Sequence, residues 1–250
     1  MRRFLQYIVV VMVALCATSC VWDEGEVASG RKLGAQLWSI SKNDLIRVNE
    51  IFDYIARYNQ SLSIEDEASR QLFIARYIKC ESISVNGNTH TINHTTLYDS
   101  SYTVTIKMFD DRWEVTRTGG YGYELTIRPK STNTVYSVEM AHIYNNSSKG
   151  HGTFDIEIEY IDSNPRISYS GELVMVDDAE SATRPLTVTT KITSPLSYNP
   201  TTLFTKGEIT ITAYDALYDT TDQAKVTVLH NEYNKIIIEC MGDVTGYTYQ

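Results

Sequence analysis

His90 and His94 are four positions apart, and this spacing is the one in the sequence that most resembles a metal-binding pair. On a helix, four positions make about one turn, and such a pair could hold a metal ion. The surrounding segment is rich in threonine and asparagine, which favours a strand or a loop. On a strand the two rings would point the same way but lie about 13 Å apart, too far for one ion. We therefore predict no metal site here, and His142, His151 and His230 are scattered singly.

Paired carboxylates are the second candidate for chemistry, because glycosidases place two acids across a cleft. Asp110-Asp111 and Asp177-Asp178 occur at expected turns, where aspartate is favoured for local hydrogen bonds. Asp155, Glu157 and Glu159 alternate along an expected strand and so share one face. That face could bind a cation or a basic partner, but we interpret it as a solvated outer face.

No motif of a serine hydrolase, zinc peptidase, P-loop or dinucleotide site is found in the sequence. We therefore predict no catalytic residue, no metal and no cofactor. Trp113, Tyr121 and Tyr123 lie near an expected turn, and their rings are candidate contacts for a sugar ligand.

Two amphipathic helices are predicted over residues 41–81, as a helical hairpin. The first should run from Asp44 to Asn59, after a capping-box pattern that begins at Ser41. Its apolar positions recur at helical spacing, while Arg47 and Glu50 lie on the opposite, polar side. The second helix should open after Ser63 and end near Lys79.

From residue 82 onward the apolar period changes to two, which predicts strands. Asn86-Gly87 is the strongest hairpin signal in this region. About ten strands joined by short turns predict an antiparallel meander over residues 82–250. We therefore expect an α+β fold, with the helical hairpin packed on a large curved antiparallel sheet, either a half-barrel or a sandwich. Residues 41–250 should form one folded unit.

Cys80 and Cys240 are the two cysteines after the first twenty residues. A disulfide between them would tie the end of the second helix to a late strand, and a loop of that length could stabilise the fold by roughly 4–5 kcal/mol. Two buried free thiols are the alternative. The sequence leaves both open.

The start of the chain is a targeting segment. Arg2 and Arg3 precede an apolar run from Phe4 to Ala17, which is shorter than the roughly 17–25 residues that span a membrane. Ala17-Thr18-Ser19-Cys20 resembles the lipobox of bacterial lipoproteins, although that box usually begins with leucine. The resemblance implies that residues 1–19 are removed and that Cys20 carries the lipid. The alternative is an ordinary cleaved signal with a chance cysteine.

Residues 20–40 are predicted to be the tether of the anchored protein. An acidic cluster, residues 23–26, follows Cys20 and resembles the export signal of Bacteroidota surface lipoproteins. The resemblance implies the outer membrane, with the cell surface favoured and the periplasmic face open. Without residues 1–19 the chain has 20 basic and 31 acidic residues, a formal charge of −11. That charge disfavours nucleic acid as a partner.

The sequence thus predicts a lipid-anchored outer-membrane lipoprotein that acts as a non-enzymatic binding or structural accessory. Its partners would be the membrane, through the lipid, and an unknown protein or glycan. One alternative is a carrier or chaperone for an apolar ligand, which a cavity lined by both sheet and helices would favour. The other is a glycan-acting enzyme, which two acids converging in a cleft would favour.

Overall fold

The structure is a computed structural model that describes residues 30–95, 101–119, 121–130, 134–145, 148–161, 164–177, 186–199, 203–229 and 235–248. Its helices are α2 (Gly30–Leu62), α3 (Glu67–Phe73) and the π-helix η1 (Ile74–Ile78). Its strands are β1 (Ser82–Asn86), β2 (Thr89–Thr95), β3 (Ser101–Met108), β4 (Trp113–Thr118), β5 (Tyr123–Pro129), β6 (Val135–Asn145), β7 (Ser148–Ile161), β8 (Asn164–Asp177), β9 (Leu186–Asn199), β10 (Leu203–Asp215), β11 (Thr220–Val228), β12 (Lys235–Cys240) and β13 (Asp243–Thr248). Cys20 and the signal segment lie outside the described residues.

The first helix, α2, is much longer than predicted, and it begins at Gly30 instead of Asp44. Residues 30–40, the second half of the predicted tether, are therefore helical and continuous with the first predicted helix. Leu33 and Leu37 are buried and extend the apolar stripe toward the start of the helix. Ser41, which the sequence suggested as a cap, is fully buried and accepts a hydrogen bond from Thr190 Oγ1 at 2.8 Å. Ser41 therefore lies inside the helix and makes a polar contact with the sheet, and it does not cap the start of a helix.

The second helix is short. Asp66 caps α3 by accepting a hydrogen bond from the backbone N–H of Ser69, and the following π-helix ends at Lys79 in a left-handed conformation. The predicted end near Lys79 is thus confirmed. The guanidinium of Arg57 on α2 lies over the ring of Tyr77, 4.9 Å from its centroid, so η1 packs back onto α2. None of the described helices is both long and apolar enough to cross a membrane.

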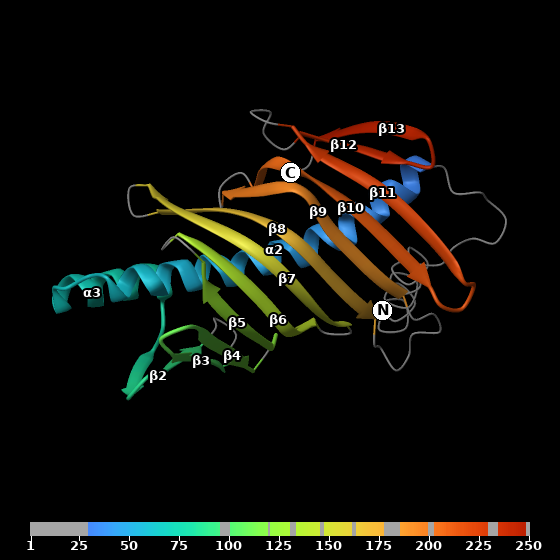
Figure 1. Ribbon diagram of the computed structural model, residues 1–250. Coiled ribbons are helices and arrows are strands. Elements are labelled where there is room, and N and C mark those ends of the chain that lie inside the picture. The colour runs from blue at the N-terminus through green and yellow to red at the C-terminus, as the bar shows by residue number, and fades with distance from the viewer. Residues whose placement is uncertain are drawn as a thin grey trace, which may run out of the picture.

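All thirteen described strands belong to one antiparallel sheet, and their order in the sheet is their order in the chain (Figure 1). The predicted meander is confirmed, but two stacked sheets are not formed, so the sandwich alternative is wrong. The predicted hairpin is present, but its loop is shifted by one residue: Asn86 pairs with Thr89, and the two loop residues are Gly87, with a φ of 59°, and Asn88. Glycine thus stands at the first loop position, whereas the Asn-Gly signal places it at the second. Bulges interrupt the register of the central strands, for example between Tyr169 and Gly171. Bulges bend and twist a sheet locally, and these contribute to its curvature.

The core lies between α2 and the concave face of this sheet, which the helix crosses diagonally (Figure 1). Phe52, 1% exposed, is at its centre, where its ring meets those of Phe154 and Tyr169 edge-on at 5.5 Å each. Toward the start of α2, the helix approaches β12 closely. A Cβ added at Gly34 would lie 2.8 Å from Ile238 Cγ2, so a side chain there would separate helix and strand.

Candidate functional site

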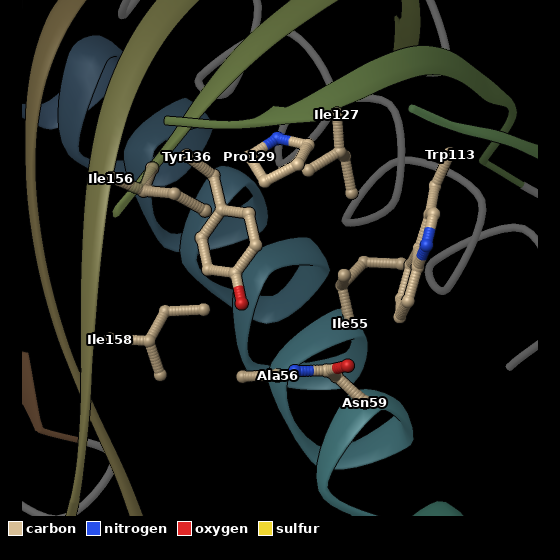
Figure 2. Close-up of a pocket in the computed structure, with 9 residues that line it drawn as sticks. All are labelled: Ile55, Ala56, Asn59, Trp113, Ile127, Pro129, Tyr136, Ile156 and Ile158. Atoms are coloured by element: carbon tan, nitrogen blue, oxygen red, sulfur yellow. The ribbon is translucent and has the colours of Figure 1, made fainter. Parts of the chain in front are cut away.

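An apolar cavity of about 330 Å³ lies between the second half of α2 and strands β4 to β7 (Figure 2). Its lining residues are Ile55, Ala56, Asn59, Trp113, Ile127, Pro129, Tyr136, Ile156 and Ile158. For comparison, a protein cavity of roughly 150 Å³ can hold benzene, and ligand pockets begin at about 300 Å³. The cavity is therefore large enough for a small ring system or a short acyl segment.

Strand register explains why the sheet side of this cavity forms. Trp113 pairs with Ile127 across β4 and β5, and Tyr136 on β6 pairs with both Pro129 and Ile156. Cross-strand partners project to the same face of a sheet, so their side chains form a continuous apolar floor beneath α2. In Figure 2, Trp113 and Tyr136 stand on opposite sides of the cavity, with Ile127 between them.

The helix side of the cavity is formed by Ile55, Ala56 and Asn59, which share one face of α2. Ala56 leaves room because its side chain is a single methyl group. Tyr160 on β7 donates a hydrogen bond from its hydroxyl to the Ala56 carbonyl at 3.0 Å, which fixes this turn of the helix against the sheet. Burial raises the pKa of the Tyr136 hydroxyl, which therefore stays neutral at physiological pH.

A second, more polar pocket of about 250 Å³ lies further toward the start of α2. It contains Tyr121 and Tyr123, two of the three predicted sugar contacts, whereas Trp113 lines the apolar cavity instead. The structure thus separates Trp113 from the two tyrosines. Of these two tyrosines, Tyr121 is exposed, whereas Tyr123 is 4% exposed and forms part of the pocket wall.

The two histidines of β2 are placed against two tyrosines of α2. Tyr58 Oη lies 2.6 Å from His90 Nδ1, and Tyr54 Oη lies 3.0 Å from His94 Nε2. Each histidine of β2 thus contacts its own tyrosine on α2. Burial raises the pKa of Tyr58 to about 12 and lowers the pKa of both histidines, so all four groups stay neutral near pH 7. These pairs hold the first strands of the sheet against the helix.

The histidine pairs give a prediction about pH: the free energy of unfolding should fall as the pH drops below about 6.5. An unfolded histidine titrates near that value, whereas burial lowers the pKa of His94 in the folded protein. Between the two pKa values the unfolded chain binds more protons, so stability rises with pH. Urea unfolding at several pH values would measure this slope.

The control for the pH prediction is a set of three substitutions. The double variant His90→Gln/His94→Gln should flatten the slope between about pH 7 and pH 5.5, where carboxylates contribute little. His142→Gln, on an exposed position of β6, should leave it unchanged. An equally steep slope in the double variant would show that these histidines are not its source.

Cys80 and Cys240, for which the sequence left a disulfide and two buried thiols open, are free thiols in the structure; Cys240 is buried and Cys80 is half-buried. Cys240 lies beside Gly34. Cys80 instead lies close enough to Tyr54 to affect its pKa. The twenty residues between Gly34 and Tyr54 span about 30 Å of helix, whereas a disulfide requires Cα atoms within about 7 Å.

The predicted acidic residues do not converge. Asp155, Glu157 and Glu159 are exposed on the outer face of β7, as expected for a solvated face. Asp111 is exposed and pairs with Arg112 at 3.0 Å, and Asp178 lies outside the described residues. Within the described ranges, no cluster of three histidines, cysteines or carboxylates could hold a metal ion.

Sequence reasoning named Trp113, Tyr121 and Tyr123, which line the two pockets, but missed the other lining residues. Arg47 was assigned to a solvent-facing side of the helix but is half-buried beneath the ring of Tyr121. Tyr136 and Ile156 lie on strands that the sequence predicted. Their position in the same cavity as Trp113 depends on how those strands pair, which the sequence does not show. Comparison with known proteins finds no matching family model, curated protein or solved structure.

Proposed function

We propose that this protein is a lipid-anchored lipoprotein of the outer membrane that binds an apolar ligand without transforming it. The supporting observation is the cavity of about 330 Å³ whose apolar lining comes from both α2 and the sheet. This combination favours the carrier alternative over a purely structural accessory. In this proposal the fold is an α+β half-barrel, and α3 with η1 forms the short second limb of the helical hairpin.

The chemistry of the cavity supports binding over catalysis. Eight of its nine lining residues are apolar or aromatic, and Asn59 supplies the only amide side chain. Its lining includes no histidine, cysteine or carboxylate, and its one ionisable side chain, Tyr136, has a pKa raised by burial. A neutral tyrosine is a weak general base and a weak nucleophile. Apolar surfaces buried on binding contribute roughly 25 cal/mol per Å². A ring or short acyl group would bind mainly by this effect, with Asn59 or the Tyr136 hydroxyl orienting one polar atom.

The anchor supports the same role. A lipid on Cys20 would hold the cavity beside a membrane, where apolar molecules partition. The sequence pattern of residues 17–20 is the basis for this part of the proposal. The cell surface is favoured by the acidic residues 23–26, and the periplasmic face remains the alternative.

Filling the cavity should abolish ligand binding. The probe is N-phenyl-1-naphthylamine, a neutral dye whose fluorescence rises in an apolar site, titrated into residues 21–250, which contain the whole described fold. Ala56→Leu places a larger side chain in the cavity, and we expect the dye to bind at least about tenfold more weakly, a difference of about 1.4 kcal/mol. The same substitution at Ala75, which is exposed on η1, is the matched control and should leave the affinity unchanged.

Two results would contradict the proposed binding site. The first is a wild-type protein that does not bind the dye. The second is an Ala56→Leu variant that folds, by its thermal unfolding curve, and binds as tightly as wild type. Equal weakening by Ala56→Leu and Ala75→Leu would also count against the cavity, because only one of these side chains lies in it.

A further inference from the structure

The polar pocket beside the apolar cavity is lined by two arginines and several tyrosines. Its residues are Arg47, Glu50, Ile51, Tyr54, Tyr102, Val104, Arg117, Tyr121, Gly122, Tyr123, Ile143 and Tyr144. Arg47, Glu50, Ile51 and Tyr54 follow each other along one side of α2 at spacings of three and four. On the sheet, Arg117 pairs with Val104 on one side and Tyr123 on the other. Both arginines are therefore placed by regular elements.

Each guanidinium lies over a tyrosine ring. Arg47 Cζ is 4.2 Å from the centroid of Tyr121, and Arg117 Cζ is 3.8 Å from that of Tyr102. The ring of Tyr102 is in turn stacked on His94, with centroids 4.5 Å apart. These cation–π contacts hold both guanidinium groups at the pocket, and a ring face accepts none of their N–H hydrogen bonds in the way that a carboxylate does.

Some of those donors are buried and lack an acceptor. Among the described residues, Arg47 Nη1 and Arg117 Nε are buried without a hydrogen-bond partner, and neither arginine forms an ion pair. A buried donor without a partner costs about 1–3 kcal/mol, and more when it is charged. An oxyanion in the pocket would remove that cost.

The charge in the pocket favours an anion. Two guanidinium groups face one carboxylate, Glu50, whose side chain is partly buried in the pocket and partly exposed at its rim. Burial raises the pKa of Glu50, and the positive charges of Arg47 and Arg117 act in the opposite direction. Even with Glu50 ionised, the pocket carries a net positive charge. It is set in a protein whose overall charge is negative.

We propose that this pocket is a second binding site, which takes a small ring-containing molecule bearing a carboxylate. The planar carboxylate would accept hydrogen bonds from Arg47 and Arg117, whose forked geometry matches it. The ring would lie against the exposed faces of Tyr121 and Tyr144, which are 41% and 47% exposed. This site is independent of the apolar cavity, which has neither arginine.

Calorimetric titration of the full chain in detergent tests this site with three probes. Glucuronate carries a carboxylate on a sugar ring, benzoate carries one on an aromatic ring, and glucose has no charge. We expect at least one of the two acids to bind and glucose not to bind. Arg117→Gln should weaken the bound acid at least tenfold, while Arg128→Gln, on an exposed position of β5 outside the pocket, should not change it.

Arg47→Gln removes the arginine on the helix side of the pocket, and its effect on the affinity for the acid is a second, independent measurement. If Arg117→Gln disturbs the stacking on Tyr102 enough to unfold the protein, the weakening by Arg47→Gln decides instead. Failure of both acids to bind would overturn the proposal, as would glucose binding as tightly as glucuronate. Acid binding that is unaffected by both pocket substitutions would place the anion elsewhere and overturn it too.

Discussion

Replacing Phe52 by alanine is expected to lower the free energy of unfolding by about 3–5 kcal/mol. Phe52 is 1% exposed, and its ring contacts Phe154 on β7 and Tyr169 on β8. The substitution removes the aromatic contacts and leaves a cavity at the centre of the interface between helix and sheet. Domains are stable by only about 5–15 kcal/mol, so this loss would bring the protein close to unfolding. Urea unfolding followed by circular dichroism measures it.

Ile40→Ala is the matched control for Phe52→Ala. Ile40 lies on the same helix but is 40% exposed, so its truncation should change the free energy of unfolding by less than about 1 kcal/mol. A loss below about 1 kcal/mol for Phe52→Ala would contradict the position of α2 in the core. It would mean that the sheet folds without support from the middle of the helix.

Replacing Cys20 by alanine is expected to move the protein from the membrane fraction to the soluble fraction almost completely. The lipobox resemblance implies two or three lipid chains on this cysteine, and each buried CH₂ contributes about 0.8 kcal/mol to membrane binding. Alanine has no sulfur to carry the lipid. Fractionation of cells followed by immunoblotting measures the distribution.

Cys16→Ala is the control, because Cys16 follows Leu15 and lacks the small residue expected before a lipidated cysteine. It should leave the protein in the membrane fraction. A Cys20→Ala protein that stays there would contradict the anchor. Protease treatment of intact cells then separates the two faces of the membrane, since only a surface-exposed protein is degraded.

The strand region was predictable because its signals are local. The alternation of apolar residues and the Asn86-Gly87 turn depend on neighbours in the chain, and the meander follows from short turns. The start of α2 was not predictable in the same way. Ser41 and Asp44 resemble a helix cap in the sequence, but both are buried in the structure. The strand that contacts Ser41 is distant in the chain, so the sequence could not show that this serine packs on the sheet.

The pockets could not be predicted because they depend on register between distant segments. Arg117 is an ordinary charged residue in an alternating strand until Tyr102 and α2 are placed beside it. The pairing of Tyr54 and Tyr58 with His94 and His90 was not visible in the sequence. Residues four apart are separated by about 6 Å along a helix and about 13 Å along a strand, so only the packing of α2 on β2 brings each tyrosine to its histidine.

The sequential order of the thirteen strands has a consequence for how the chain folds. Each strand pairs with its neighbour in the chain, so the sheet can grow one hairpin at a time with little loop-closure entropy. The helix is the exception, because α2 precedes every described strand, whereas Gly34 near its start packs against Ile238 and Cys240 of β12. The apolar residues at the start of α2 therefore stay uncovered until β12 has formed. The late, aggregation-prone step is therefore the docking of the start of α2 onto β12.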